Sequence, residues 1–545
     1  MDDNIEIGRE PPKTSGAQVD TIETSLPQSQ KTDSHHASKD KAAEFLKAAG
    51  RSVVVTAGDN SRVLRKIDLR ILPVILGIYF LQSLDKTSLS YASVFGLIKD
   101  AHLVGDQYSW LGAIVYLAQL VMQPAVMYFL VKLPIGKFTA TMVLCWGAVL
   151  CCMAAATTFK GLVATRFFLG AFEASVGPAF IAIVQMWYRR SEQTNRNAAW
   201  YSMLGVVNML GSLLSYGLGH IKSSTLRSYQ IIFLFCGALT VAFSIFIFMI
   251  LPDSPMEAKF LKTDRDKLIA VERLRMNQMG ISSREWKWDH VIETVLDLKT
   301  WLWFCMLTAI SIPSGGISTF GPLIVESFGF DSFTTILFNI PFGAVQFVAT
   351  LGSAYLATRW KLKSPLLAAL CLPPIAGCAM LLAVPHDKAH RGILLAGYYI
   401  ISVYPAISPL IYSWSSQNTA GDTKRKVTTG ILFIGQSAGN IVGPHLYSPS
   451  EAPKYTKGLT SNLALFVVLE ILIVIGVFVI KILNVRHAKT RASLGKAYDV
   501  VDLSMEAHKE MKIKGEVLNE SVALVGDKAF DDITDLDNED FIYLY

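Results

Sequence analysis

The chain has 545 residues, of which 52% are hydrophobic and only 17% are charged. Soluble domains carry about 25% charged residues, so the composition excludes a soluble globular protein and indicates a membrane protein. The formal net charge of +6 is small for this length and predicts no nucleic-acid partner. All seven cysteines lie in apolar stretches, which indicates buried thiols rather than a disulfide framework or a zinc site.

Residues 1–68 are polar, rich in Ser, Thr, Asp, Lys and Gln, and lack the apolar core of a signal peptide, so they are predicted to be a disordered tail. Twelve apolar runs of membrane length follow, six on each side of a polar stretch. They lie near 71–91, 110–131, 138–158, 161–185, 198–219, 229–251, 301–325, 333–357, 364–384, 392–413, 428–447 and 462–484.

This layout predicts an all-α membrane protein with about 12 transmembrane helices in two six-helix bundles. The predicted parts are an N-terminal tail (1–68), a first bundle (69–251), a central loop (252–300), a second bundle (301–484) and a C-terminal tail (485–545).

Basic residues determine the predicted orientation. With the N-terminus inside, the short inside loops hold eleven Lys and Arg residues and the outside loops hold eight, while the central loop adds nine on the inside. Both termini are therefore predicted to be cytoplasmic. Residues 263–278 place apolar side chains at helical spacing among charges, with Thr263 or Asp264 as the N-cap. They predict an amphipathic cytoplasmic helix, with a partner-binding helix as the alternative.

Three ionisable residues inside the apolar runs are the main functional signal. Asp85 and Lys86 are adjacent in the first run, and Glu173 lies in the fourth. A charge at a bilayer centre costs about 2.5–3.5 kcal/mol on insertion scales. Neighbouring helical residues point about 100° apart, so Asp85 and Lys86 do not satisfy each other. Either Lys86 pairs with Glu173, or the acids load and unload protons; the two interpretations are compatible. Gln82, one turn earlier, extends this polar face.

The fourth run places Arg166, Gly170, Glu173 and Gly177 on one helical face. Small residues let another helix approach closely, so the two glycines are predicted packing positions. Arg166 lies near the outer end of the run and is either part of this face or an interfacial residue.

Other runs contribute polar and small side chains. Asn208 in the fifth run, with Gln436 and Asn440 in the eleventh, are predicted to offer hydrogen bonds to a substrate. Gly439 and Gly443 belong to a ladder of small residues that predicts close helix packing.

The seventh run contains Pro313, Gly315 and Gly316. These residues predict a broken helix, and broken membrane helices tend to border substrate pathways.

No motif of an enzyme is present. Residues 435–439 read GQSAG and match the G-x-S-x-G pattern of hydrolases, but they lie in an apolar helical run instead of following a strand. The chain has no Walker loop, no H-E-x-x-H and no dinucleotide fingerprint. We therefore expect no enzymatic activity, no metal and no cofactor.

Seven motifs carry a resemblance to a known family. They are LDKTSLSYASVFGLIKDAHLVGDQYSWLG (84–112), LPIGKF (133–138), RFFLGAFEASVGPAF (166–180), QMWYRRSEQTNRNAAWYSMLG (185–205), LPDSP (251–255), NTAGDTKR (418–425) and GNIVGP (439–444). From about residue 62 to about 490 the sequence resembles the allantoate permease branch of the fungal anion:cation symporters, within the major facilitator superfamily.

This resemblance implies a two-bundle carrier that alternates between inward-open and outward-open states around a central site. Family members move small organic anions: ureides such as allantoate, vitamin-like carboxylates, some amino acids and dipeptides. Related organic-anion carriers couple protons through a first-span Asp and a fourth-span Glu, which match Asp85 and Glu173. Their first-span basic residue, often Arg, binds the substrate carboxylate; Lys86 stands there and cannot form the bidentate fork of Arg.

The expected function is therefore proton-coupled symport of a small organic anion by a monomer, with the proton gradient as energy source. The plasma membrane is favoured over a vacuolar or other endomembrane. The alternative is export or compartmentalisation of a fungal secondary metabolite. Residues 131–138 read VKLPIGKF in place of the usual G-x-x-x-D-R-x-G-R motif, and the fifth run lacks a Gly-Pro motif. Both departures weigh against a drug exporter.

Overall fold

The computed structural model describes residues 56–545 with several gaps. These gaps are 95–96, 105–106, 220, 222–225, 275–276, 278–284, 331–336, 388, 448–450, 452–453 and 499–531. Most of the predicted N-terminal tail thus lies outside the described residues. Its last part is helical, because the first described helix, α2, begins at Ala57, twelve residues before the predicted start of the first bundle at 69.

All regular elements of the described residues are helices, as predicted. The first half contains α2 (Ala57–Val94), α3 (Leu97–Asp100), α4 (Gln107–Lys132), α5 (Ile135–Met153), α6 (Phe159–Glu173), α7 (Val176–Trp187), α8 (Arg190–Tyr201), α9 (Met203–Gly219) and α10 (Ser228–Ile250). The second half contains α13 (Leu298–Ser327), α15 (Asn339–Trp360), α16 (Ser364–Ala383), α17 (Arg391–Ile401), the 3₁₀ turn η2 (Tyr404–Ala406), α18 (Ile407–Gln417), α19 (Asp422–His445) and α20 (Thr456–Ser493). Between them lie α11 (Asp264–Glu272) and α12 (Trp288–Leu296).

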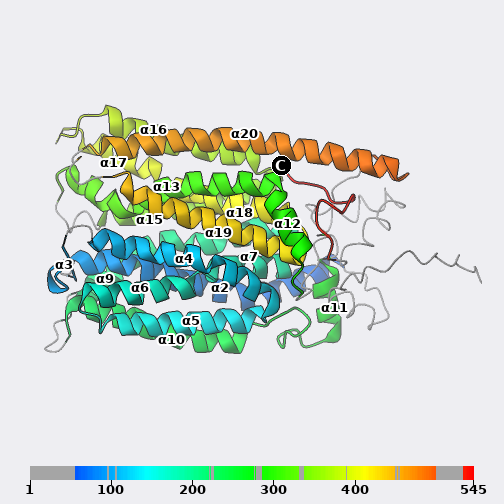
Figure 1. Ribbon diagram of the computed structural model, residues 1–545, viewed down its shortest axis with the longest axis horizontal. Coiled ribbons are helices and arrows are strands. Elements are labelled where there is room, and N and C mark those ends of the chain that lie inside the picture. Colours follow the sequence, from blue (N-terminus) through cyan, green and yellow to red (C-terminus); the bar gives the residue numbers. More distant parts are fainter. Residues whose placement is uncertain are drawn as a thin grey trace, which may run out of the picture. The chain divides into compact units, whose positions relative to one another are not determined.

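The predicted membrane spans coincide with these helices. In the part of the chain that the structure describes, ten segments are long and apolar enough to cross a membrane. The two other predicted spans, near 198–219 and 428–447, fall on α9 and α19. The long helices of both halves run along a common direction, and α11 and α12 lie together at one end, which we call the tail end (Figure 1).

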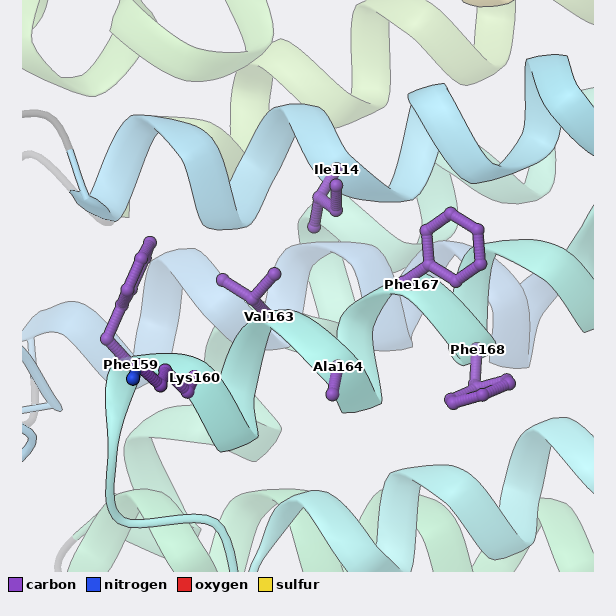
Figure 2. Close-up of a pocket in the computed structure, with 7 residues that line it drawn as sticks. All are labelled: Ile114, Phe159, Lys160, Val163, Ala164, Phe167 and Phe168. Carbon is purple, nitrogen blue, oxygen red and sulfur yellow. The ribbon is translucent and has the colours of Figure 1, made fainter.

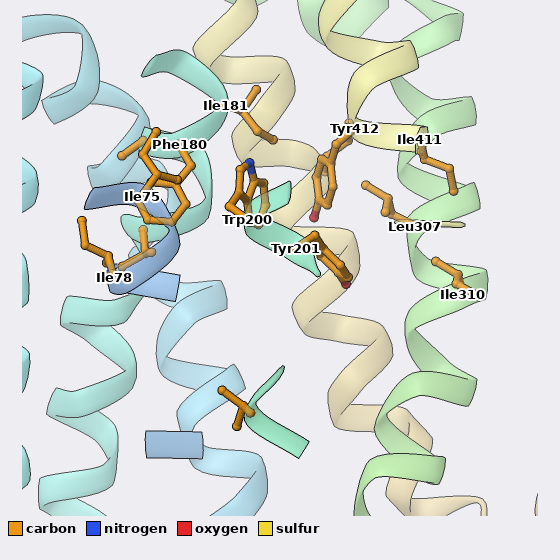
Figure 3. Close-up of a cluster of buried hydrophobic side chains, with 14 of the residues drawn as sticks. Ile75, Ile78, Phe180, Ile181, Trp200, Tyr201, Leu307, Ile310, Ile411 and Tyr412 are labelled. Atoms are coloured by element: carbon orange, nitrogen blue, oxygen red, sulfur yellow. The ribbon is translucent and has the colours of Figure 1, made fainter. Parts of the chain in front are cut away.

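The two halves pack through a few helix pairs, among them α4 with α19, α9 with α15 and α8 with α18. Glycine allows the closest of these approaches. A Cβ atom at Gly205 of α9 would lie 2.5 Å from the backbone oxygen of Gly343 in α15. Aromatic residues fill part of the space between the halves: Trp200 of α8 packs on Phe180 of α7, and Tyr201 of α8 lies beside Tyr412 of α18 (Figure 3).

The predicted break in the seventh span is wrong. Helix α13 continues from Leu298 to Ser327 through Pro313. A proline inside a membrane helix removes one hydrogen bond, which neighbouring groups can offset. Glycines give α13 close contact with α19 instead: a Cβ atom at Gly315 would lie 2.9 Å from the Asn440 backbone oxygen, and one at Gly439 would lie 2.7 Å from the Ser311 Cβ.

The same interface uses two further glycines. Gly316 faces the Tyr447 ring, and Gly443 faces the backbone oxygen of Ile312. The ladder of small residues in α19 therefore packs on α13, as its spacing predicted.

The central loop forms the predicted amphipathic helix, α11. The Thr263 hydroxyl caps it by accepting a hydrogen bond of 3.2 Å from the Asp266 backbone N–H. Asp266 also holds α11 on α2, since its carboxylate lies 2.9 Å from the Arg62 guanidinium and 2.7 Å from the Lys66 ammonium. The helix ends at Glu272, earlier than the predicted segment 263–278.

Candidate functional site

Lys86 and Glu173, two of the charges predicted inside the spans, form a pair between α2 and α6. The Lys86 Nζ lies 3.7 Å from the Glu173 Oε2 and 5.7 Å from the centre of the Tyr116 ring in α4. The Lys86 side chain is 31% exposed, whereas that of Glu173 is fully buried. An approaching anion would therefore reach the ammonium group before the carboxylate behind it.

The Glu173 carboxylate has little compensation for its burial. Gln119 Nε2 donates a hydrogen bond of 3.3 Å to Oε2, and Gln82 donates one of 3.4 Å to the Glu173 backbone oxygen. Oε1 is buried without a hydrogen-bond partner among the described residues. A buried carboxylate needs hydrogen bonds and a close counter-charge to remain ionised. One ion pair at 3.7 Å and one side-chain hydrogen bond are the compensation that the described residues give the Glu173 carboxylate.

Asp85 points away from Lys86, toward α5 and α10. Its carboxylate is buried and accepts a hydrogen bond of 2.6 Å from Trp146 Nε1 on Oδ2, with the Thr240 hydroxyl 3.5 Å from the same oxygen. Asp85 and Lys86 therefore meet different neighbours, as expected of adjacent residues on a helix. Sequence reasoning missed Trp146; an indole N–H in an apolar run needs an acceptor, and that was the available signal.

Arg166 belongs to the buried face of α6 and is not interfacial. Its side chain is only 2% exposed, and Nε and Nη2 have no hydrogen-bond partner in the described part of the chain. It lies within electrostatic range of both Glu173 and Asp85. Of the glycines predicted on this face, Gly170 contacts the backbone of Val115 in α4. Arg166 is thus a buried positive charge near the two acids, Glu173 and Asp85.

Gly177 contacts the other half of the molecule. It lies in α7 and faces the Phe433 ring of α19. A side chain here would collide with the ring, so the residue acts in packing between the halves.

The polar residues predicted in the second half form a separate group. The Tyr412 hydroxyl donates a 2.6 Å hydrogen bond to Gln436 Oε1, and Asn440 Nδ2 donates one of 2.9 Å to the Gln436 backbone oxygen. Tyr116 beside Lys86 and Tyr412 beside Gln436 are contacts that the sequence did not reveal.

In the part of the chain that the structure describes, Asn208 forms no hydrogen bond with Tyr412, Gln436 or Asn440. Its Nδ2 donates a 2.7 Å hydrogen bond to Gln346 Oε1 and links α9 to α15. The predicted substrate-binding role of Asn208 therefore stays a prediction.

A cavity of about 440 Å³ lies elsewhere, beside α4 and α6 (Figure 2). It is lined by Ile114, Phe159, Lys160, Val163, Ala164, Phe167 and Phe168. None of the predicted site residues lines it, and its walls offer almost no hydrogen-bonding groups. We therefore place the functional site at Lys86 and Glu173 and not in this cavity.

No cluster of three or more His, Cys, Asp or Glu side chains that could hold a metal ion occurs among the described residues. All seven cysteines are free thiols.

Comparison with known proteins identifies the family. The sequence profile of the Major Facilitator Superfamily matches residues 75–444. The Thiamine pathway transporter THI73 of Saccharomyces cerevisiae is 32% identical over 93% of this chain and 94% of its own length. The Allantoate permease of the same yeast is 32% identical over 83% of this chain and 84% of its own length.

The solved structure of the proton:xylose symporter XylE has the same fold, with a TM-score of 0.60, 10% sequence identity, and coverage of 76% of this chain and 95% of that one. The chain therefore belongs to the Major Facilitator Superfamily, in the allantoate permease branch that its motifs resemble, and is a multi-pass membrane transporter of small molecules and not an enzyme.

Proposed function

We propose that this transporter is a symporter that couples the entry of a small organic anion to a proton. The observation that carries the proposal is the pair in which a partly exposed Lys86 meets a buried Glu173 with one oxygen unpaired. Allantoate, which one relative is named for, is a carboxylate. This relationship supports an anionic substrate such as a ureide, a vitamin-like carboxylate, an amino acid or a dipeptide.

The charges of Lys86 and Glu173 provide a physical basis for coupling proton binding to anion binding. While Glu173 is ionised, it neutralises Lys86 and weakens the attraction of the ammonium group for an anion. When Glu173 binds a proton, Lys86 keeps its charge and becomes free for a carboxylate. Proton and anion are then bound together and released together. Asp85 is the second proposed proton carrier, and no bound cofactor is needed because the proton gradient supplies the energy.

We further propose that the tail end faces the cytoplasm, with both termini on that side, and that the carrier works as a monomer in the plasma membrane. The support is the excess of Lys and Arg in the loops of this end. Asn519 begins an N-E-S sequon in the undescribed stretch 499–531. Protein expressed in yeast should carry no glycan at Asn519, and a glycosidase-sensitive shift that is lost in Asn519→Gln would reverse the orientation.

Transport by the purified chain in proteoliposomes tests the coupling. A proton gradient is imposed, and uptake is followed for labelled allantoate, other carboxylates, zwitterions and neutral analogues. Glu173→Gln keeps the shape of the side chain but cannot titrate, so it should lose uphill accumulation and retain exchange. Asp387→Asn, a change at an exposed loop carboxylate, is the matched control. Uphill transport by Glu173→Gln that still collapses with the proton gradient would refute the role of Glu173.

The same panel separates the two transport functions. Preference of the wild type for neutral compounds, with no effect of Lys86→Ala on their transport, would favour the metabolite carrier over the anion symporter.

A further inference from the structure

Residues 532–545, which we call the latch segment, lie against the helix ends at the tail end (Figure 1). The segment reads DITDLDNEDFIYLY. Its first part carries five acidic residues and no basic one, and its last part is apolar and aromatic. Such a peptide fits a groove that offers cations at one side and apolar contacts at the other.

The acidic part of the latch segment is held by lysine side chains. The Asp535 carboxylate is fully buried and lies 2.7 Å from the Lys299 Nζ of α13 and 2.9 Å from the Lys424 Nζ of α19. Asp532 lies 2.8 Å from the Lys287 Nζ, just before α12. Three separate segments, at the start of α12, α13 and α19, therefore supply the counter-charges.

The aromatic part is held through its backbone. Asn418 donates a hydrogen bond of 2.9 Å to the Leu544 oxygen and accepts one of 2.6 Å from the Leu544 N–H. Asn484 makes the same pair of bonds with Tyr543, both at 2.9 Å. The Trp414 indole N–H adds a 2.8 Å bond to the Leu544 oxygen. Paired bonds of this kind fix the register of the peptide as well as its position.

One residue of the first half joins this docked peptide. Arg190, at the start of α8, donates a 3.2 Å hydrogen bond to the Ile542 oxygen, and its guanidinium lies 4.6 Å from the centre of the Phe541 ring. Its Nε donates a 3.0 Å bond to the Gln417 oxygen at the end of α18. Arg190 is thus bound at once by α18 and by the latch segment, so separation of the halves at this end breaks both contacts.

We propose that the latch segment holds the tail end of the transporter closed, and that it must leave Arg190 before this end opens. The surface that it covers is a docking site for an acidic peptide ending in aromatic residues, and its occupant is residues 532–545 of this chain. The proposal rests on the proposed symport and on the alternation between inward-open and outward-open states that the family resemblance implies. A released segment shifts the population toward the state that is open at the tail end.

Cross-linking across the tail end tests the proposal in the full chain, in nanodiscs and without the seven native cysteines. The Thr358 hydroxyl of α15 donates a 3.0 Å hydrogen bond to Asn195 Oδ1 of α8, so the two positions are in contact across this end. We expect Asn195→Cys with Thr358→Cys to form a disulfide when this end is closed, and the rate in the full-length chain is the reference. A stop after residue 531 should slow disulfide formation about tenfold by lowering the closed population. Adding a synthetic 532–545 peptide should restore the rate, and a scrambled peptide should not.

Phe541→Ala supplies a milder variant that leaves the ion pairs intact. It removes the ring under Arg190 and should slow cross-linking by about threefold. Leu494→Ala, at an exposed position after α20, is the matched control and should leave the rate unchanged. Unchanged cross-linking in Phe541→Ala, or in a truncated chain that remains monodisperse, would overturn the latch. Disulfide formation reports conformation and not transport, so it remains readable if the proton coupling proposed above fails.

Discussion

Two groups of buried charges in this transporter are built differently. At the tail end, the Lys424 Nζ lies 2.6 Å from Glu293 and 2.9 Å from Asp535. In the first half, Lys86 has one carboxylate at 3.7 Å, and Glu173 keeps an oxygen without a partner among the described residues. Fully paired charges hold segments together, whereas poorly paired charges remain available for a proton or a substrate.

The titration of the two groups should differ for the same reason. Burial alone would raise the pKa of Asp535, but the charges of Lys299 and Lys424 hold it well below its ordinary value. A carboxyl group with a lowered pKa stabilises the fold above its unfolded pKa and loses this contribution only as the pH falls through the folded pKa. Asp535 is therefore ionised throughout the physiological range and is not suited to carry protons.

The largest expected effect is the removal of Lys424. Lys424→Ala leaves the carboxylates of Asp535 and Glu293 buried with less counter-charge, which should lower the free energy of unfolding by about 3–5 kcal/mol. Thermal unfolding in detergent measures the loss. Lys137→Ala removes an ammonium that is 74% exposed and 3.8 Å from Asp253, and it should cost less than about 1 kcal/mol. Equal melting temperatures of the two variants would mean that the tail-end network does not stabilise the fold.

Next in size is the loss of the hydrogen bond to Asp85. Trp146→Phe leaves a buried carboxylate oxygen without its donor and should destabilise the protein by about 1–3 kcal/mol. Trp187→Phe is the matched control, because Trp187 is equally buried and its indole N–H has no partner in the described part of the chain. If both variants unfold at the same temperature, the hydrogen bond between Trp146 and Asp85 contributes no net stability.

Replacing one member of the Lys86–Glu173 pair should lower the stability of the protein more than replacing both. Lys86→Ala or Glu173→Ala alone leaves one member of the pair without the other, whereas the double variant removes both charges of the pair. We expect the double variant to be within about 1 kcal/mol of wild-type stability and yet inactive in anion uptake. Lys86→Arg keeps the charge but changes its geometry, so substrate affinity should change more than the melting temperature. An active double variant would restrict Lys86 to balancing Glu173.

The sequence predicted those parts of the molecule that the membrane itself constrains. Apolar runs located the helices, and the cost of charges inside them singled out Lys86, Glu173 and Asp85. A pair between Lys86 and Glu173 was one of two interpretations of the charges inside the spans, and the structure contains this pair. The predicted break at Pro313 was wrong, because neighbouring glycines serve packing against α19 instead of ending α13.

The docking of the latch segment could not be predicted in the same way. Asp535 meets Lys299 and Lys424, and Leu544 meets Asn418, all more than 100 residues away along the chain. Local periodicity carries no information about such partners. The available signal was the acidic stretch followed by FIYLY, because an apolar sequence is unusual in a solvated tail.

The smallest expected effect concerns pH and His290, which lies in α12 beside the latch segment. Burial lowers the pKa of His290, and the charges of Lys287 and Lys424 lower it further, while Asp532 and Asp422 oppose them. A histidine with a lowered pKa favours the neutral form in the folded state. Its contribution to stability is therefore complete above its ordinary pKa of about 6.5 and declines as the pH falls below that value.

Melting temperatures between pH 8 and 5 should thus fall toward the acid side. The nearby Glu293 acts in the opposite direction, because burial raises its pKa despite the charge of Lys424, so its protonation stabilises the fold in acid. The comparison of His290→Gln with wild type isolates the histidine, since Glu293 is common to both. His290→Gln should flatten the acid-side decline, and the exposed His445→Gln should not. Identical pH profiles for wild type and His290→Gln would show that the tail end does not respond to this histidine, and that its stability depends on the ion pairs of Asp535 alone.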